Sequence, residues 1–400
     1  MARLERIAIV GASLAGLRAA ESLRALGYRG ELLVVGAEKH LPYDRPPLSK
    51  EILQGRWDVD RIGLRKKPYG ELALDLRLGV RATALDVAGR ELVLAGGARE
   101  RFDALLIATG ASPRRLRDQP ELPGLHLLRS LDDALAIRAA LERRPRVAVV
   151  GAGFIGAEVA ASCRARGLEV TVIEPLPVPL ARGLGERMGG ICAELHRDHG
   201  VDLRCGVGVA GFEGAGRVER VRLADGSVVA ADLVVVGVGA APETAWLASS
   251  GLRLDDGVVC DAYCSAAPGI FAAADVARWH NPLFAETMRV EHWSNAVEQG
   301  AYVAARLAGS DDGAQPFAPV PFFWSDQYDV KIQFAGRMRG DDEVQVVAGS
   351  LADRKFTALY GRAGKLVGVL AFSRPRDLAK YRRLIAAGTD YATAVSGAGG

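Results

Sequence analysis

Two glycine-rich loops carry the clearest chemical signal in the sequence. The first reads Gly11-Ala-Ser-Leu-Ala-Gly16 and the second reads Gly151-Ala-Gly-Phe-Ile-Gly156. Each loop follows a short apolar strand and opens a helix, and a glycine turn there lets the backbone approach a pyrophosphate, whose charge the helix N-terminus stabilises. The second loop has the full GxGxxG spacing, whereas Ser13 replaces the middle glycine of the first. The sequence therefore predicts two dinucleotide sites.

An acidic residue follows each loop at the distance typical of a ribose ligand. Glu174 lies 18 residues beyond Gly156, at the end of a predicted strand, and Glu38 lies 22 residues beyond Gly16. A carboxylate there accepts hydrogen bonds from ribose hydroxyls and repels a 2′-phosphate, which favours NADH over NADPH at the second loop. Arg182 is close enough in sequence to leave some use of NADPH open.

Four further residues could contact a flat cofactor. Lys50 ends a proline-rich segment that is stiff enough to place a side chain accurately. Asp275 follows an apolar strand, where a helix N-cap is the alternative role. Trp293 and Trp324 lie beyond the second loop and are either core aromatics or a cover for the cofactor.

The elements that must position these residues occur twice. The first set is a strand at 7–10, a helix at 17–26, a strand at 31–35 and a closing strand at 105–110. The second set is a strand at 146–150, a helix to about 166, a strand at 169–173 and a closing strand at 233–239. Two nucleotide folds in series are therefore expected. From about residue 319 the pattern changes to strands at 322–336, 343–350, 356–362 and 366–372 and a helix at 376–387, which predicts a smaller α+β domain.

Composition narrows the class of protein. The 400 residues include 51 basic and 48 acidic side chains, so the net charge of +3 gives no support for binding nucleic acid. No apolar run approaches the roughly 20 residues of a membrane span, and a cytoplasmic protein is expected. The five cysteines have no CxxC spacing, which argues against a disulfide relay, and no metal site is expected.

Taken together, these residues resemble the NADH-dependent, FAD-containing ferredoxin reductases of oxygenase and cytochrome P450 systems, of the putidaredoxin-reductase and rubredoxin-reductase type. The resemblance covers nearly the whole chain. The segments that carry it are Gly11–Gly16, Pro42–Lys50, Ala108–Gly110, Gly151–Gly156 with Glu158, Ala274-Asp275, Glu291–Trp293 and Phe323–Tyr328. The segments ending at Lys50 and Tyr328 are specific to this group. Ser13 and Ala274 depart from it, since glycine is usual at both positions.

The resemblance implies a glutathione-reductase-like α/β fold. A NAD-binding domain (113–241) would interrupt an FAD-binding domain (1–112 and 242–318), and a C-terminal domain (319–400) would cover the flavin. The residues expected at FAD are Gly11, Ser13, Leu14, Ala15, Gly16, Glu38, Arg45, Lys50, Ala82, Ala108, Thr109, Gly110, Arg129, Asp275, Glu291, His292, Trp293 and Trp324. Those expected at NADH are Gly151, Gly153, Phe154, Ile155, Gly156, Glu158, Glu174, Arg182, Val238 and Gly239. Lys50 and Glu158 are the expected catalytic residues, with Glu158 facing the nicotinamide and pairing with Lys50.

The function implied is transfer of a hydride from NADH to FAD, followed by transfer of single electrons to an iron–sulfur ferredoxin that supplies a cytochrome P450 or a ring hydroxylase. The basic run Arg65-Lys66-Lys67 is a candidate docking site for an acidic ferredoxin. Two alternatives share the cofactor motifs. One is a reductase of a small acceptor such as a quinone, a radical or oxygen, and the other is an NADH-sensing binding protein of the apoptosis-inducing-factor type.

Overall fold

A parallel β-sheet forms the centre of each of the two units into which the contacts of the chain divide it. The computed structural model describes residues 4–309 and 313–397. Unit 1 comprises residues 1–44, 63–112 and 241–322, and unit 2 comprises residues 45–62, 113–240 and 323–400. Each unit is therefore assembled from three separate stretches of the chain.

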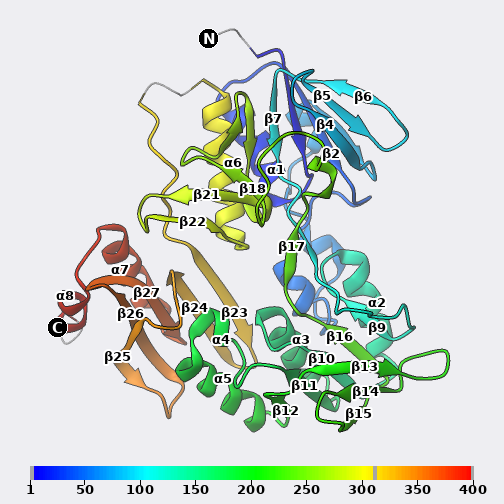
Figure 1. Cartoon of the computed structure of the whole chain (residues 1–400), viewed down its shortest axis with the longest axis vertical. Coiled ribbons are helices and arrows are strands. Elements are labelled where there is room, and N and C mark those ends of the chain that lie inside the picture. The colour runs from blue at the N-terminus through cyan, green and yellow to red at the C-terminus, as the bar shows by residue number, and fades with distance from the viewer. Residues whose placement is uncertain (1–3, 310–312, 398–400) are drawn as a thin grey trace. The chain divides into compact units, whose positions relative to one another are not determined.

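Unit 1 contains a six-stranded sheet in the order β19-β20-β7-β1-β2-β3, in which the last five strands run parallel. Two of these strands, β2 and β7, are labelled in Figure 1. Its strands are β1 (Arg6–Val10), β2 (Glu31–Gly36), β3 (Leu74–Leu78), β7 (Ala104–Ile107), β19 (Ser265–Ala267) and β20 (Ile270–Ala272). Helices α1 (Leu14–Ala25) and α6 (Trp293–Leu307) pack closely, because Gly300 has no Cβ to meet the Ala15 carbonyl. Two three-stranded sheets are added: β4 (Ala82–Asp86), β5 (Glu91–Leu94) and β6 (Arg99–Arg101), and β18 (Val258–Cys260), β21 (Ala277–Asn281) and β22 (Glu286–Arg289).

Unit 2 repeats this arrangement in a five-stranded parallel sheet of order β12-β11-β10-β16-β9. Its elements are β9 (Leu125–Leu127), α2 (Leu131–Leu141), β10 (Val147–Val150), α3 (Phe154–Ala165), β11 (Val170–Glu174), α4 (Ala181–Leu184), α5 (Glu186–Asp198), β12 (Asp202–Cys205) and β16 (Leu233–Val236). A meander of β13 (Val209–Glu213), β14 (Arg220–Leu223) and β15 (Val228–Ala230) precedes β16. The short strands β8 (Ala111–Pro113) and β17 (Ala240–Pro242) pair with each other, and residues 111–112 and 241–242 of this pair belong to unit 1. The order β16-β10-β11-β12 matches β7-β1-β2-β3, so the predicted duplication of the nucleotide fold is confirmed.

The C-terminal part of unit 2 is a five-stranded sheet of order β23-β24-β27-β26-β25. Its elements are β23 (Phe322–Gln327), β24 (Val330–Gly336), β25 (Glu343–Ser350), β26 (Lys355–Arg362), β27 (Lys365–Phe372), α7 (Pro375–Ala386) and α8 (Tyr391–Ser396). One buried apolar cluster joins this sheet to α4 and α5: Leu184, Met188, Cys192 and Leu195 pack with Phe334, Phe356, Tyr360 and Phe372. The C-terminal sheet and the second nucleotide fold therefore share a hydrophobic core.

Several predicted elements have different ends in the structure. The helix predicted from residue 17 begins at Leu14, because Ser13 is its N-cap and the last loop glycine lies in its first turn. The segment 322–336 is two strands rather than one, since Tyr328 has a φ of 57° and turns the chain. The closing strands stop at Ile107 and Val236, before the glycines that follow them. Helix α8 was not predicted, because its six residues carry too little periodicity.

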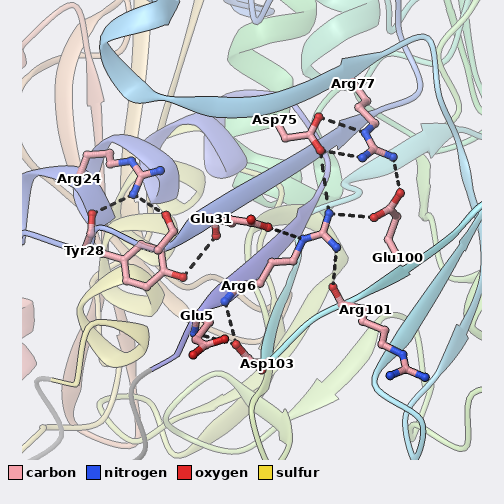
Figure 2. A network of polar contacts seen from close by, with 11 residues as sticks. Glu5, Arg6, Arg24, Tyr28, Glu31, Asp75, Arg77, Glu100, Arg101 and Asp103 are labelled. Atoms are coloured by element: carbon pink, nitrogen blue, oxygen red, sulfur yellow. Dashed lines mark hydrogen bonds and ion pairs between the residues drawn. The ribbon is translucent and has the colours of Figure 1, made fainter.

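Charged residues fix the N-terminal ends of the central strands of unit 1 (Figure 2). Arg6 Nη2 donates to Glu100 Oε2 at 2.8 Å and Arg77 Nη1 donates to Glu100 Oε1 at 2.5 Å. The hydrogen bond from Arg77 is the main cause that lowers the pKa of Glu100. Asp103 Oδ2 accepts the backbone N–H groups of Glu5 and Arg6, both at 2.7 Å. Ligands of parallel sheets bind at the carboxyl ends of strands, so this network belongs to the framework.

Within residues 4–309 and 313–397, no helix is long and apolar enough to cross a membrane. The longest helix, α6, has 15 residues. That length is short of the roughly 20 residues needed to cross a bilayer.

Candidate functional site

The first glycine loop joins the carboxyl end of β1 to the N-terminus of α1. Gly11 has a φ of 121°, and a Cβ there would overlap the carbonyl oxygen of Ala108. A Cβ at Gly16 would overlap the carbonyl oxygen of Gly11. Glycine is therefore required at both ends of the loop, where the backbone packs against itself at the sheet edge that binds ligands in this fold.

The second loop has the same geometry. Gly151 has a φ of 95°, a Cβ there would approach the Gly237 carbonyl, and a Cβ at Gly156 would overlap the Gly151 carbonyl. A Cβ at the middle residue, Gly153, would meet no heavy atom within 4 Å. The equivalent position of the first loop is Ser13, whose side chain makes no capping hydrogen bond. The middle position thus has room for a serine, and this departure leaves the close contacts of the first loop intact.

Glu174 is buried at the end of β11, beside the second loop. Its Oε2 accepts the Ala152 N–H at 2.7 Å and its Oε1 accepts the Leu176 N–H at 3.0 Å. The carboxylate therefore also holds the shape of the loop, a role that the spacing alone did not indicate. Arg182 lies exposed on α4.

Asp275 lies in a single 3-10 turn over residues 274–276. The N-cap of that turn is Ala273, so the alternative reading of Asp275 as an N-cap is wrong. Ala274 has a φ of 67°, in the left-handed region that glycine enters without steric cost, which accounts for glycine being usual at this position.

The other predicted residues of unit 1 lie after β2, on β4, after β7 and at the start of α6. Glu38, just after β2, accepts a hydrogen bond from the Tyr43 hydroxyl. Trp293 opens α6, and its Nε1 donates to Asp44 Oδ1 at 2.7 Å. The rest lie on β4, after β7 and at the entry to α6: Ala82, Ala108, Thr109, Gly110, Glu291 and His292.

A buried ion pair lies beside the second loop, in unit 2. Lys50 Nζ donates to Glu158 Oε2 at 2.8 Å, and the side chains are 8% and 4% exposed. Ser49 Oγ donates to the same oxygen at 2.5 Å and Ser325 Oγ donates to Glu158 Oε1 at 2.7 Å. Burying a carboxylate this deeply is unfavourable unless it is paired and hydrogen-bonded, and these three donors provide both. The predicted pairing of Lys50 with Glu158 is confirmed, whereas the two serines were missed.

The periodicities of α3 and β23 explain how Ser325 reaches Glu158. Phe154 and Glu158 are one helical turn apart on α3, and Phe323 and Ser325 lie two residues apart on one face of β23. Four residues along a helix and two residues along a strand both span roughly 6–7 Å. Phe154 can therefore face Phe323 while Glu158 faces Ser325. The rings of Phe154 and Phe323 lie 4.5 Å apart, which sets Ser325 opposite Glu158. Alternation within Phe323–Gln327 indicates that Phe323 and Ser325 share a face of the strand, but it does not indicate that this face meets a carboxylate.

The remaining predicted residues of unit 2 flank these groups. Arg45 Nη1 donates to the carbonyl of Arg129 at 2.7 Å. Ile155, the second residue of α3, is 48% exposed, which is unusual for a large apolar side chain. Val238 and Gly239 follow β16, as Thr109 and Gly110 follow β7, and Trp324 lies on β23 between Phe323 and Ser325.

The cysteines are not arranged for redox exchange. All five are free; Cys205 is half-buried and Cys163, Cys192, Cys260 and Cys264 are buried. Burial raises the pKa of Cys163, Cys192 and Cys260 to about 12. Over the described ranges there is also no group of three or more His, Cys, Asp or Glu side chains that could hold a metal ion.

We expect one thiol, that of Cys205, to react with an aromatic disulfide reagent in the native protein at pH 8, and all five to react in denaturant, because only thiolates attack the reagent. Counting released thiolate by absorbance checks this. Rapid reaction of two or more native thiols would show an accessible redox pair instead.

Arg65, the first residue of the predicted docking run, is engaged within unit 1. Its guanidinium pairs with Glu21 and with Glu71, each at 2.9 Å, and its side chain is 9% exposed. The side chain therefore stabilises the fold, and the prediction that Arg65 docks a partner is not supported by its surroundings.

Comparisons with known proteins cover both units. A family model described as pyridine nucleotide-disulphide oxidoreductase matches residues 5–300, and one described as reductase C-terminal matches residues 322–396. Rhodocoxin reductase of Rhodococcus erythropolis is 37% identical over 95% of this chain and 89% of that protein. The solved ferredoxin reductase for the CYP199A2 system from Rhodopseudomonas palustris is 38% identical, with a TM-score of 0.92 over 96% of this chain and 95% of that one. The reductase in the covalent putidaredoxin reductase–putidaredoxin complex is 33% identical, with a TM-score of 0.91 over 96% and 93%.

These matches confirm the predicted fold class of two Rossmann-type domains followed by an α+β domain. They also confirm FAD and NAD(H) as the cofactors, which are those of this family. The chain is an oxidoreductase that belongs to the pyridine nucleotide-disulphide oxidoreductase family and, within it, to the ferredoxin reductase components.

Proposed function

We propose that the chain is an FAD-dependent NADH:ferredoxin oxidoreductase, which passes electrons from NADH to an iron–sulfur ferredoxin that serves a cytochrome P450 or a ring hydroxylase. The observation that carries the proposal is the duplicated glycine-loop fold with a buried Lys50–Glu158 pair beside its second loop. The buried, unpaired cysteines support direct transfer from the flavin over a thiol relay, and they support a reducing compartment such as the cytoplasm.

The residues present fit the two cofactors. We place FAD on residues 1–112 and 242–318 and NADH on residues 113–241, with residues 319–400 covering the flavin. Bound FAD would supply the chemistry that the side chains lack, which is acceptance of a hydride and release of single electrons. The N-termini of α1 and α3 would stabilise the two pyrophosphates, since Gly11 and Gly151 shape the loops so that the backbone can approach them.

The side chains act by binding and orienting. Glu174 would accept hydrogen bonds from the ribose of NADH, and Asp275 would contact the ribityl chain of FAD. Lys50 and Glu158 would supply a fixed pair of charges at the nicotinamide, which costs no reorganisation during the transfer because both are already held by hydrogen bonds. Trp324 would lie near the isoalloxazine.

The acceptor is tested by mixing the yellow protein anaerobically with NADH and then with ferredoxin, a quinone or oxygen. We expect reduction of a cognate ferredoxin to be the fastest of the three. A ferredoxin rate no greater than the quinone rate would favour the small-acceptor alternative. A reduced flavin that persists as a long-lived complex with NAD⁺ would favour the NADH-sensing alternative.

Docking is tested by charge reversal. Arg65 of the basic run is already paired with Glu21 and Glu71, so the charge-reversal variant leaves it in place. The double variant Lys66→Glu/Lys67→Glu should slow ferredoxin reduction, most at low salt, and leave reduction of ferricyanide unchanged.

Replacing Glu174 with alanine should raise the KM for NADH by a factor of about 10 to 100, because loss of ribose hydrogen bonds to a charged group costs about 1.5–3 kcal/mol. The preference for NADH over NADPH should fall as well, since the repulsion of the 2′-phosphate is removed. Steady-state kinetics with both nucleotides measures this.

Glu174→Gln provides the control for the structural role of Glu174. Its amide keeps an acceptor for the Ala152 N–H, so stability should change less than in the alanine variant, which leaves that N–H unpaired. If the native protein had the same kcat/KM with NADPH as with NADH, the proposed role of Glu174 in repelling the 2′-phosphate would be contradicted.

A further inference from the structure

We propose that Ser325, on β23 of the C-terminal sheet, is a positioning residue for the transfer from NADH to FAD. Its hydroxyl fixes the orientation in which the Glu158 carboxylate pairs with Lys50. The inference rests on the proposed function, because it concerns the first half of that reaction.

The two oxygens of the Glu158 carboxylate have separate partners. Oε2 accepts hydrogen bonds from Lys50 at 2.8 Å and from Ser49 at 2.5 Å, whereas Oε1 accepts a hydrogen bond from Ser325 at 2.7 Å. The last torsion of a glutamate is broad, so a carboxylate held at one oxygen can turn about its terminal bond. Ser325 therefore supplies the second attachment that stops this rotation.

The direction of the Ser325 hydrogen bond is set by a third residue. Gln327, two residues along the same face of β23, donates from Nε2 to Ser325 Oγ at 3.2 Å. A hydroxyl has one proton, so Ser325 accepts from Gln327 and donates to Glu158. Both side chains are fully buried, and a chain of hydrogen bonds that all point toward a carboxylate strengthens each member.

A second set of contacts joins the segment that carries Lys50 to helix α3. Ser162, one turn beyond Glu158 on α3, donates to the Ser49 carbonyl at 2.7 Å, and Gln54 Nε2 donates to Ser162 Oγ at 3.0 Å. The backbone at Ser49 and Lys50 is thus fixed to α3 without help from the C-terminal sheet. Removal of the Ser325 hydroxyl should consequently let the Glu158 carboxylate rotate about its terminal bond without displacing Lys50.

The test uses the full-length, flavin-loaded protein and three variants. Ser325→Ala removes the hydroxyl, Ser325→Thr keeps it, and Thr357→Ala is a matched control, because Thr357 is also a buried hydroxyl of the C-terminal sheet that donates to a carboxylate, that of Asp377 at 2.6 Å. Reduction of the flavin by NADH is followed anaerobically by rapid mixing. A second readout, independent of turnover, is the rate at which an amine reagent modifies Lys50, measured by peptide mass spectrometry without NADH.

We expect Ser325→Ala to slow flavin reduction about tenfold, the equivalent of one hydrogen bond to a charged group, with the Kd for NADH changed less than about twofold. Modification of Lys50 should be faster in this variant, since the carboxylate no longer stays against the ammonium. Ser325→Thr should restore both readouts, and Thr357→Ala should move neither.

Three results would overturn the inference. They are an unchanged reduction rate in Ser325→Ala, an equal loss in Thr357→Ala, and unchanged modification of Lys50. If Ser325→Ala does not retain FAD, Ser325→Cys takes its place, because its thiol fills the space of the hydroxyl with a slightly larger group that is only a weak donor. Failure of the native flavin to be reduced by NADH would instead contradict the proposed function, so the two failures are distinguishable.

Discussion

Replacing Glu158 with alanine is expected to lower the free energy of unfolding by about 3–5 kcal/mol, because removal of one member of a buried ion pair leaves the other charge without compensation. Lys50 would lose its partner at 2.8 Å in a position where its side chain is 8% exposed. The hydroxyls of Ser49 and Ser325 would lose their acceptor at the same time. Urea unfolding followed by circular dichroism measures the change.

A double variant separates stability from function. Lys50→Met together with Glu158→Leu replaces both charges with apolar groups, and such replacements are often neutral or stabilising, so most of the lost stability should return. Reduction of the flavin by NADH should stay slow. The exposed pair Lys365–Asp390 is the control, since Lys365→Ala should cost at most about 1 kcal/mol. A loss of the same small size for Glu158→Ala would contradict the argument.

Acid should destabilise unit 2 between pH 6.5 and pH 4 mainly through His196, with a smaller contribution of the same sign from His126, whose pKa is also lowered by burial. Burial, and secondarily the nearby His199, lowers the pKa of His196 from 6.5 to about 4. In this window the unfolded chain binds a proton that the folded chain does not, so stability is complete above pH 6.5 and falls as the pH falls. The full loss is about 3 kcal/mol, of which about 2 kcal/mol should be lost by pH 5.

His196→Asn tests this assignment. His196 Nδ1 lies 2.7 Å from the Tyr328 hydroxyl, and an asparagine amide can occupy the place of Nδ1 without titrating. The unfolding free energy of the variant should therefore change little between pH 7.5 and pH 5, where the native protein loses most of its acid-sensitive stability. Parallel losses in the two proteins would show that His196 is not the source.

The glycine loops, the strands beside them and Glu174 could be predicted because their signals are local. Gly11 and Gly151 are required by backbone contacts that recur wherever a strand turns tightly into a helix. For the first loop, in which Ser13 weakens the motif, the prediction depends on the place of the loop between a strand and a helix and on Lys50, Asp275 and Trp324 elsewhere in the chain. The structure explains that exception by the open space at the corresponding Gly153.

The polar partners of the ion pair could not be predicted, because they are brought together by tertiary packing alone. Ser325 lies 167 residues from Glu158 in the sequence, and Ser49 lies 109 residues from it. A serine in a strand or in a proline-rich turn has no pattern that distinguishes a ligand of a buried carboxylate from a solvated hydroxyl. The second role of Glu174 was missed for the same reason, since spacing indicates a ribose ligand and says nothing of the Ala152 N–H.

The apolar cluster that joins the C-terminal sheet to α4 and α5 limits how this protein can be recombined. A chimera cut at the domain boundary near residue 322 would pair a foreign sheet with Leu184, Met188 and Leu195, and close-packed interiors tolerate such mismatches poorly. Exchange of the C-terminal sheet between relatives should succeed when α4 and α5 are taken from the same relative as the sheet. When new reductases are made by recombination, the unit to exchange is thus the C-terminal sheet together with α4 and α5, although the two are separated by more than a hundred residues of chain.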